Sequence, residues 1–440
     1  MISRQRIVGK TNGSSAYILS IVEHLKANGF RIHYVSPSPA TFGRWPFIRL
    51  LPEMDVFETV CIRGSIRLGR FLILLNPFVA LRGAIAVLDQ LLARTGLTKR
   101  RLGRPAPYSI ALPLSPRDSA FLRSRVPPVA DQLLLDYAFL TPCIEVVGTE
   151  RPSIVIMHDL FSARAPQFAS LNQSDSAARL SAAEEMALLS AADLIVAIQE
   201  EEAATVRKWL PGKRVVVAPM AVQPVTHPYP GNSDTILFVG SNTAPNIDGL
   251  RCFISEAWPR ITRQRPSSRL LVAGSVVWSY APQVAGVRYL GVLPNLDDPY
   301  RRAGVVISPL RVGSGLKVKL LEALSWGKAV VATSVTTQGI GPLLDKAIVI
   351  ADDPEDFAFN VVALMNDEEE RGRYGAQALQ AASRHFGEDT CYEGILSFIT
   401  DGAAAGPLGQ PHLEIGLRCC MGASDQSPSL ARTDVHYSAQ

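Results

Sequence analysis

The sequence predicts an α/β protein of two domains, each a parallel sheet covered by helices on both faces. Short apolar runs rich in β-branched residues alternate with helix-like stretches along most of the 440 residues. A stretch rich in proline, Gln223 to Asp234, interrupts this alternation and is typical of a linker. A second complete alternating series begins after it. We therefore expect two Rossmann-like domains that face each other over a cleft.

The strands expected in each domain are short apolar runs, and helices fill the intervals. In the first half the runs are "RIHYVS", "DQLLLDYAF", "PSIVIMHD", "ADLIVAIQ" and "RVVVAPMAV". In the second half they are "TILFVGS", "RLLVAGS", "VRYLG", "AGVVISPL" and "AIVIADD". We place an N-terminal domain at 1–225 and a C-terminal domain at 226–382. The polar, aperiodic tail at 400–440 is expected to be disordered.

The charge balance and the cysteines exclude several classes of protein. The net charge of +4 is too low for a dedicated nucleic-acid binder. Six cysteines show no metal-binding or disulfide spacing, which indicates reduced thiols in the cytoplasm. The first ten residues include basic side chains but no apolar run, so we expect no signal peptide.

The segment from Cys61 to Arg104 is basic and apolar. It holds nine basic residues and one acid, a net charge of +8, whereas the rest of the chain is slightly acidic. Its uncharged run from Phe71 to Leu81 has 11 residues, too few for the roughly 20 of a spanning helix. Two interpretations remain open: a segment at an anionic membrane surface, or a helical part of the N-terminal domain with its apolar face in the core.

The stretch from Ser308 to Ser334 predicts a strand, a turn at Gly313-Ser314-Gly315, and a helix that Gly315 opens and Gly327 ends. Free backbone N–H groups at such a helix start bind anions, and glycines let a phosphate approach closely. The stretch is neither a Walker A loop nor a dinucleotide fingerprint. On spacing alone, a helix cap without a ligand fits equally well.

Two charged side chains in that helix favour a phosphate site. Lys319 and Glu322 are three residues apart and share one helical face. A lysine neutralises a diphosphate, and a carboxylate accepts hydrogen bonds from vicinal hydroxyls of a sugar. The alternative is a plain salt bridge on a solvated face.

His158 is the candidate of the N-terminal domain, because it follows an apolar strand at the edge where ligands bind in such sheets. The alternative is a structural histidine, with Asp159 capping the next turn. No Asp-x-Asp pair stands at a suitable strand end, and Asp353 with Pro354 is expected to start a helix. We therefore expect no metal.

From Thr235 to about Ile399 the sequence resembles the catalytic domain of the group 1, nucleotide-sugar-dependent retaining glycosyltransferases of GT-B fold. The pieces that carry the resemblance are "ILFVGSNTAPNIDGL", "RLLVAGS", "VRYLGVLPNLDDPYRRAGVVISPLRVGSGLKVKLLEALSWGKAVVATSVTTQGI" and "EDFAFNVVALMNDEEERGRYG". The N-terminal half is similar in "NGSSAYILSIVEHLKANGFRIHYVSP", "HDLFSAR" and "ADLIVAIQEEE". The resemblance implies a GT-B fold, with a helix at 383–399 crossing back to the first domain.

The resemblance also implies roles for particular residues. Glu322 matches the second glutamate of the E-x7-E motif, which holds the ribose, and Ser314 stands where the first glutamate belongs. Lys319 matches the diphosphate-binding basic residue, and His158 a histidine near the donor sugar. The implied donor-binding residues are Gly13, Gly240, Ser241, Asn242, Arg311, Gly313, Ser314, Gly315, Lys319 and Glu322, with His158 and Lys319 as catalytic residues. Asn246 follows the loop at 240–242 as an alternative helix cap, and Leu293 and Pro294 would border the nucleobase.

The implied activity is sugar transfer, with retention, from a nucleotide-diphosphate-sugar to a hydroxyl of a sugar or lipid-linked acceptor, as in polysaccharide assembly. We expect no cofactor. No metal is implied, since helix dipoles and a lysine stabilise the charge that gathers on the departing diphosphate, and no separate base, since that diphosphate accepts the proton. We expect a cytoplasmic protein, peripheral at the inner membrane face. The alternatives are a non-catalytic nucleotide-sugar-binding protein, which Ser314 favours, and an epimerase or phosphorylase of the same fold.

Overall fold

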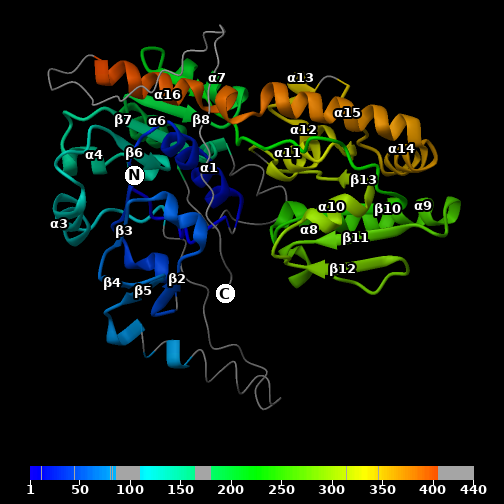
Figure 1. Cartoon of the computed structure of the whole chain (residues 1–440), viewed down its shortest axis with the longest axis horizontal. Coiled ribbons are helices and arrows are strands. Elements are labelled where there is room, and N and C mark those ends of the chain that lie inside the picture. The colour runs from blue at the N-terminus through cyan, green and yellow to red at the C-terminus, as the bar shows by residue number, and fades with distance from the viewer. Residues whose placement is uncertain are drawn as a thin grey trace, which may run out of the picture.

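The computed structural model describes residues 1–440 apart from 11, 44, 80, 82, 86–109, 164–179, 314, 345 and 405–440. Two α/β bodies lie side by side along the long axis of the molecule (Figure 1). The part of the expected basic segment from 86 onward and the tail from 405 onward lie outside the described residues. Among the described residues, no helix combines the length and the apolar character that crossing a membrane requires.

The N-terminal domain is built on one parallel sheet. Its strands are β1 (His33–Ser36), β3 (Thr59–Ile62), β6 (Leu133–Asp136), β7 (Ser153–Met157), β8 (Leu194–Ala197) and β9 (Arg214–Val217). Ile2 bridges Val35 of β1 and Leu135 of β6, both in parallel, and thereby joins the pair β3-β1 to the series β6-β7-β8-β9. The chain therefore crosses from one side of the Ile2 segment to the other, which makes this a topological switch point.

Helices cover both faces of this sheet because alternate strand residues point to opposite sides. Ile154 and Ile156 of β7 pack on the side of α1 (Gly13–Ala27), whereas Val155 and Met157 pack on the opposite side. The helices on that opposite side are α3 (Pro116–Arg125), α4 (Cys143–Val147), α6 (Ala182–Ser190) and α7 (Glu200–Trp209). The central strands β6, β7 and β8 are buried on both faces, which explains their apolar sequences.

A small antiparallel sheet departs from the expected helical structure of the basic segment. It consists of β2 (Phe47–Arg49), β5 (Phe71–Leu74) and β4 (Ser65–Leu68), in that order. The helical interpretation is therefore wrong for the segment up to Leu74. The segment alternates between the two faces of a sheet: in β5, Leu72 and Leu74 are buried and Phe71 is exposed. In Figure 1 this sheet projects from the N-terminal domain on the side away from α16.

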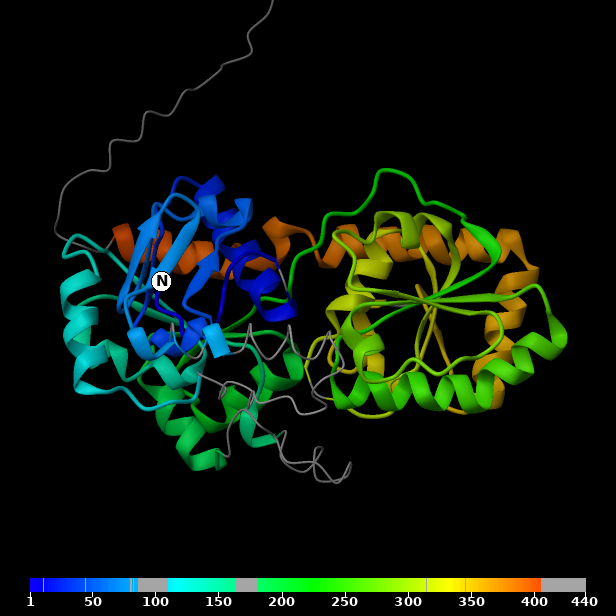
Figure 2. The ribbon, with the colours of Figure 1, turned by 90° about the horizontal axis from the view of Figure 1, so that it is seen from below.

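The C-terminal domain has a six-stranded parallel sheet between two layers of helices (Figure 2). Its strands are β10 (Asn232–Val239), β11 (Arg269–Ala273), β12 (Val287–Gly291), β13 (Ala303–Ser308), β14 (Ala329–Ala332) and β15 (Val349–Ile350). The order is β12-β11-β10-β13-β14-β15. β11 and β12 lie on one side of β10, and β13, β14 and β15 lie on the other, so a second switch point lies between β10 and β13. The helices α8 (Ala244–Cys252), α9 (Trp258–Gln264), α10 (Asp297–Arg302), α11 (Val318–Ser325), α14 (Pro354–Asn366) and α15 (Glu368–His385) surround it.

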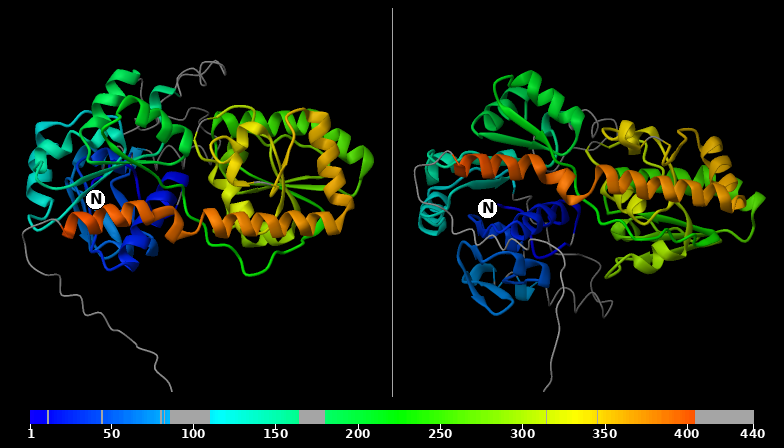
Figure 3. Two further views of the ribbon diagram at one scale, coloured as in Figure 1. Left: turned by 90° about the horizontal axis from the view of Figure 1, so that it is seen from above. Right: turned by 45° about the horizontal axis from the view of Figure 1, so that its top comes forward.

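Two connections join the domains. The linker runs through residues 218–231, and the chain returns from α15 into α16 (Glu388–Ala404), which packs on α1 and β9 (Figure 3). The Tyr392 hydroxyl of α16 donates to Ser20 Oγ at 2.8 Å and accepts a hydrogen bond from the Ala221 amide at 3.0 Å. α16 continues to Ala404, past the position where the aperiodic tail was expected to begin.

Candidate functional site

The loops that follow β10 and β13 meet at the switch point of the C-terminal sheet. Residues 240–243 lead from β10 into α8, and residues 309–317 lead from β13 into α11. A Cβ placed on Gly313 would lie 3.7 Å from Pro245 Cβ, so the loop after β13 is in contact range of the first turn of α8. Behind them, Gly274 has φ +100°, and a Cβ there would lie 2.2 Å from the Gly240 carbonyl oxygen. Only glycine fits this close approach of two backbones.

The loop at 240–242 is held by side chains from its own surroundings. The Asn242 amide donates to Ser275 Oγ at 2.9 Å. The Asn246 amide group donates to the carbonyl and the hydroxyl oxygen of Ser241, both at 3.0 Å. Asn246 itself lies inside α8, whose N-cap is Thr243. The expectation that Asn246 caps this helix is therefore wrong.

The Gly-rich turn follows β13, as expected, but the helix begins later than expected. Gly313 and Gly315 have φ angles of +135° and +72°, and α11 begins at Val318 with Lys317 as N-cap. The expectation that Gly315 opens the helix is therefore wrong, because positive φ angles keep the backbone out of the helix up to that point. Ser314 lies outside the described residues.

Lys317 occupies the inside of this turn. Its ammonium group donates to the Gly315 carbonyl at 2.6 Å and to the Gly313 carbonyl at 3.3 Å. Burial lowers the pKa of Lys317 to about 8, although Asp159 and Glu202 of the N-terminal domain act in the opposite direction. A partly buried cation therefore lies within the Gly-rich turn, close to Asp159 of the facing domain.

Lys319 and Glu322 contact each other in the first two turns of α11. Lys319 Nζ lies 2.7 and 2.9 Å from the two Glu322 carboxylate oxygens, so the plain salt bridge is formed in this structure. The buried Tyr300 hydroxyl donates to Glu322 Oε2 at 3.5 Å, and Tyr300 stacks on Trp326 with ring centroids 5.7 Å apart. Burial, with the adjacent carboxylate, raises the pKa of Tyr300 and keeps it a donor.

The Arg311 side chain forms an ion pair with a carboxylate of α8. Its Nε and one terminal nitrogen donate to the two carboxylate oxygens of Asp248 in α8, each at 2.9 Å. This bidentate pair raises the pKa of Arg311 and fixes the start of the loop against α8. The positive charge expected to neutralise a phosphate is thus partly compensated by Asp248.

His158 lies in a hydrogen-bonded chain at the switch point of the N-terminal sheet. Its Nε2 lies 2.6 Å from Oδ1 of Asp136, which is buried at the end of β6. The Ser3 hydroxyl donates to the other Asp136 oxygen. A carboxylate oxygen accepts, so the proton sits on Nε2 of the imidazole. Among the described residues no partner of His158 Nδ1 is found.

Two aromatic rings fix the plane of the imidazole. Tyr137 stacks on His158 with centroids 4.1 Å apart, and Tyr17 meets it edge-on at 5.4 Å. Tyr137 has φ +76°, the one positive φ outside glycine among the described residues. Such a backbone conformation is unfavourable for a bulky side chain and persists where its surroundings impose it. Here it places the tyrosine ring on the histidine.

The turn of the C-terminal domain lies opposite the strand ends of the N-terminal domain. A Cβ on Gly315 would lie 3.8 Å from the Asp159 carboxylate carbon, and one on Gly13 would lie 3.9 Å from Val318 Cγ2. Gly13 is the first residue of α1, and the N-cap of this helix is Asn12. Each sheet therefore presents its switch point to the other domain.

A buried acid lies close to this contact. Glu202 of α7 accepts a hydrogen bond from the Gln199 side chain at 3.1 Å, while its other oxygen is buried without a partner among the described residues. Burial, followed by repulsion from Asp159, raises the pKa of Glu202 to about 9. Glu202 is therefore protonated at neutral pH.

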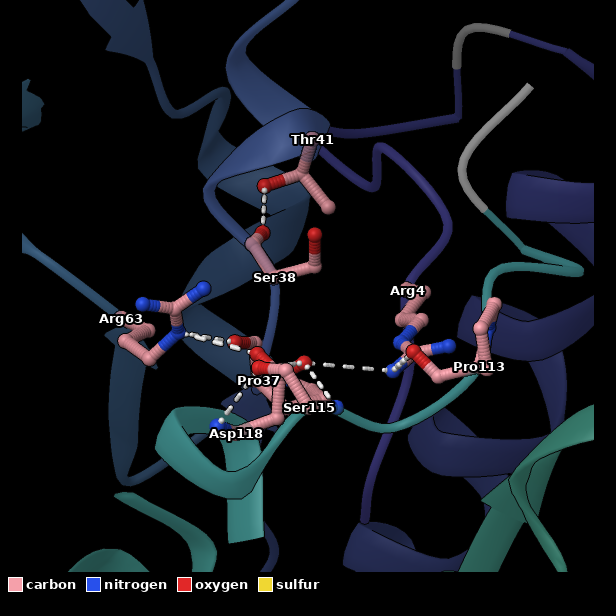
Figure 4. Close-up of polar contacts among 8 residues, drawn as sticks. All are labelled: Arg4, Pro37, Ser38, Thr41, Arg63, Pro113, Ser115 and Asp118. Carbon is pink, nitrogen blue, oxygen red and sulfur yellow. Dashed lines mark hydrogen bonds and ion pairs between the residues drawn. The ribbon is translucent and has the colours of Figure 1, made fainter. Parts of the chain in front are cut away.

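A second polar network stabilises the far end of the same sheet edge (Figure 4). Arg63, after β3, donates from Nε to the Pro37 carbonyl at 2.7 Å and to Asp118 at 2.9 Å. Arg4 lies 3.6 Å from the other oxygen of Asp118 and donates to the Pro113 carbonyl at 3.2 Å. Two guanidinium groups thus share one carboxylate, which ties α3 to the strand ends.

Within the described ranges, no group of three histidine, cysteine or acidic side chains is placed to hold a metal ion. The helix start expected at Asp353 is confirmed, since the Asp353 side chain accepts from the Glu355 amide at 2.7 Å. Asp353 therefore caps the start of α14, and Glu355 and Asp356 lie in its first turn.

Residues 233–367 match the family model described as glycosyl transferases group 1. The C-terminal domain is a group 1 glycosyl transferase domain. The match includes both loops of its switch point and the whole of α11.

Two curated relatives share part of this sequence. A 44.6 kDa uncharacterised protein of the cps region in Klebsiella pneumoniae is 28% identical over 156 residues, 32% of this chain and 40% of that protein. A phosphatidyl-myo-inositol mannosyltransferase of Mycolicibacterium smegmatis is 26% identical over 180 residues, 39% of this chain and 46% of that enzyme. The matches thus span less than half the length of these relatives.

Solved structures extend the likeness to both domains. Sucrose-phosphate synthase from Thermosynechococcus elongatus superposes with a TM-score of 0.60 at 15% identity, covering 92% of this chain and 99% of that one. Anabaena Alr3699/HepE in complex with UDP and glucose gives 0.55 at 12% identity, covering 91% and 98%. These structures show the fold: the glycosyl transferase domain and the N-terminal domain together form a GT-B architecture, as the sequence predicted.

Sequence reasoning missed three residues that the structure brings to the facing loops. Lys317 stands in the same stretch as Lys319, but the sequence motif indicates Lys319 as the diphosphate-binding residue. Asp136 carried a signal, since it is an acid that ends a buried strand. Glu202 carried none, because it stands in a run of three glutamates typical of an exposed helix start.

Proposed function

We propose that the chain transfers a sugar from a nucleotide-diphosphate-sugar to a hydroxyl acceptor, with retention at the anomeric carbon. The observation that carries this proposal is the position of the Gly-rich turn of a group 1 glycosyl transferase domain, with Lys317 inside it and Asp159 of the other domain opposite it. A nucleotide-sugar bound at that turn would lie between the two sets of strand ends.

The glycosyl transferase domain would hold the donor. The Glu322 carboxylate would accept hydrogen bonds from the ribose hydroxyls, with Tyr300 fixing its orientation. The diphosphate would lie against the Gly313–Gly315 turn, where Lys317 and Lys319 supply positive charge, with Arg311 at the edge of the loop. Negative charge grows on the diphosphate as the glycosidic bond breaks, so these cations stabilise the transition state more than the ground state.

The N-terminal domain would hold the acceptor and position His158. With Nε2 anchored on Asp136, the imidazole would present Nδ1 to a hydroxyl of the donor sugar. The departing diphosphate would take the proton of the acceptor hydroxyl, so the reaction needs no separate base. Gly13, at the start of α1, would let the ligands approach the backbone.

The acceptor is proposed to be a sugar or a lipid-linked molecule in polysaccharide or glycolipid assembly. The name of the mannosyltransferase from Mycolicibacterium smegmatis refers to a phosphatidylinositol substrate, which supports a lipid-linked acceptor. A peripheral position at the cytoplasmic face of a membrane belongs to the same proposal.

A thermal-shift screen tests donor binding. We expect one nucleoside diphosphate, and the sugar nucleotides derived from it, to raise the melting temperature of the full chain. Glu322→Gln should abolish this increase, whereas Glu256→Gln, a change of an exposed side chain in the same domain, should preserve it. The absence of stabilisation by every nucleoside diphosphate would overturn the proposal.

A non-catalytic nucleotide-sugar-binding protein is the second candidate, because Ser314 replaces the first glutamate of the E-x7-E motif. A hydroxyl cannot supply the charge of a carboxylate next to the donor sugar. Donor binding without either hydrolysis or transfer would favour this candidate. Ser314→Glu would then be expected to create measurable donor hydrolysis.

A further inference from the structure

The small sheet β2-β5-β4 and the chain after it carry a dense group of exposed apolar side chains. Sixteen large apolar side chains are exposed in the described part of the chain, and eight of them lie between Phe47 and Ile85. Scattered exposed apolar residues are common on soluble proteins, whereas a dense group of them marks an interaction surface.

The strand register places these side chains on one face. Residues paired across antiparallel strands point to the same side. In one row Phe47 and Ile66 flank Ile73, and in the next row Arg49 and Leu68 flank Phe71. Phe47, Ile66, Leu68 and Phe71 are between 43% and 58% exposed, whereas Ile48 and Leu72 on the opposite face are 2% and 1% exposed. We call the outer side the β2-β5-β4 face.

The chain that follows β5 extends the same apolar character. Leu75, Phe78 and Leu81 are 65%, 75% and 61% exposed, the highest values in this part of the chain. Trp45 adds an aromatic ring next to the face, with its centroid 6.4 Å from that of Phe47. Aromatic and leucine side chains that project into solvent are suited to the boundary between lipid headgroups and acyl chains.

The charge of the region is positive. From Cys61 to Ile85 the sequence has four arginines and no acid. Arg49 lies in the face, since it pairs with Phe71. Arg67 pairs with Leu72 and so projects from the opposite side of the edge strand β4, where its Nε donates to the Gly69 carbonyl at 3.0 Å. Neither has an ion-pair partner among the described residues, whereas Arg70 pairs with Asp55. The guanidinium group of Arg49, uncompensated and next to projecting apolar side chains, matches the phosphates of an anionic bilayer.

We propose that the β2-β5-β4 face docks the N-terminal domain on a membrane that contains anionic lipids. The inference deepens the proposed function, on which it rests, because it gives the surface that would bring the enzyme to a lipid-linked acceptor. In Figure 1 the face lies at the end of the N-terminal domain away from α16. Docking there leaves α16 and its contacts with α1 uncovered by the membrane.

Vesicle flotation of the full chain tests the proposal. We expect it to float with vesicles of phosphatidylcholine and phosphatidylglycerol more than with phosphatidylcholine alone. Leu68→Ser with Phe71→Ser should reduce the bound fraction at least about tenfold for each side chain, since each loses the transfer free energy of an apolar group. Arg49→Gln should reduce binding to the anionic vesicles about fivefold and weaken the preference for them.

Matched controls lie in the other domain. Phe359 of α14 is 66% exposed, and Arg288 is exposed in β12. Phe359→Ser and Arg288→Gln should leave flotation unchanged. Absence of flotation with anionic vesicles, or equal losses in the control variants, would overturn the proposal. So would a dimer that Leu68→Ser with Phe71→Ser converts to a monomer, because a second copy would then cover the face.

Nucleotide binding separates this inference from the proposed function. The thermal shift by a nucleoside diphosphate should be the same in the wild type and in the variants of the β2-β5-β4 face. Flotation without any nucleotide effect would contradict the glycosyltransferase proposal and leave docking standing. A nucleotide effect without flotation would contradict docking alone.

Discussion

At the residue scale, the orientation of His158 depends on groups far away in sequence. Asp136 accepts from Ser3 on one oxygen and from the imidazole on the other, and it is 1% exposed. Hydrogen bonds to a buried carboxylate are stronger than those in water, since the local dielectric is low. With Tyr137 stacked on the ring, the imidazole has one orientation available.

Asp136→Asn should therefore reduce turnover without reducing donor affinity. An amide can donate to Nε2, which favours the other tautomer and loses a charge-assisted hydrogen bond of about 1.5–3 kcal/mol, equivalent to a ten- to hundredfold fall in kcat. Steady-state kinetics should show this fall at unchanged Kd for the nucleoside diphosphate. Asp193→Asn is the matched control, because Asp193 also accepts from a serine hydroxyl, that of Ser153, but at the opposite edge of the sheet. An equal loss of kcat in both variants would contradict a role specific to His158.

Glu202 should make stability depend on pH. Its pKa of about 9 in the folded chain lies above the ordinary value of 4.5, so the folded state keeps a proton that the unfolded state releases. The free energy of unfolding should then fall as pH rises from about 5 towards 9. Glu202→Gln removes this dependence. Calorimetry should show that the free energy of unfolding of the variant, relative to that of the wild type, is higher at pH 8 than at pH 5 by about 2–4 kcal/mol.

The control for this effect is Glu201→Gln, a change in the exposed neighbour of Glu202. Its stability difference from the wild type should be the same at both pH values. If Glu202→Gln also behaved in that way, Glu202 would be ionised in the folded protein and the assigned burial effect would be wrong.

At the element scale, the path of the Gly-rich turn decides which lysine lies within it. The positive φ angles of Gly313 and Gly315 delay the start of α11 to Val318, so Lys317 precedes the helix and bends back into the turn. Lys319 lies two residues further along and forms a solvent-accessible salt bridge with Glu322, an arrangement worth about 0.2–1 kcal/mol.

Lys317→Met should therefore weaken binding of the nucleoside diphosphate more than Lys319→Met. A charge-assisted hydrogen bond lost from a partly desolvated site corresponds to about a ten- to hundredfold increase in Kd, and a solvated one to less than about fivefold. Titration calorimetry measures both variants. A larger effect of Lys319→Met would show that the diphosphate binds Lys319, the lysine that the sequence motif indicates.

The elements themselves were largely predictable, and their exceptions have physical reasons. Buried parallel strands such as β8 and β13 are continuous apolar runs, and such runs can be recognised from the sequence alone. The sequence of residues 65–74 does not distinguish strands from a helix, because its two arginines and its short apolar runs suit either structure. The Asp136–His158 pair depends on the neighbouring register of β6 and β7, which local sequence patterns do not contain.

At the scale of the whole molecule, α16 fastens the end of the described chain to the first domain. The Tyr392 hydroxyl joins Ser20 of α1 and Ala221 of the linker, and burial raises its pKa so that it stays protonated. Tyr392→Phe would leave a buried amide and a buried hydroxyl unpaired. It should lower the free energy of unfolding by about 1–3 kcal/mol, measured by urea denaturation, with unchanged nucleotide affinity. A large loss of nucleotide affinity would show instead that α16 sets the geometry of the donor site.

The most direct test of the central claim follows one nucleotide-sugar by proton and phosphorus NMR in the presence of the full chain. The account predicts release of the nucleoside diphosphate and a first-formed sugar product that keeps the anomeric configuration of the donor, with both signals lost in Glu322→Gln. A donor that binds but stays intact with every acceptor and with water would contradict glycosyl transfer. An inverted first product would contradict retention.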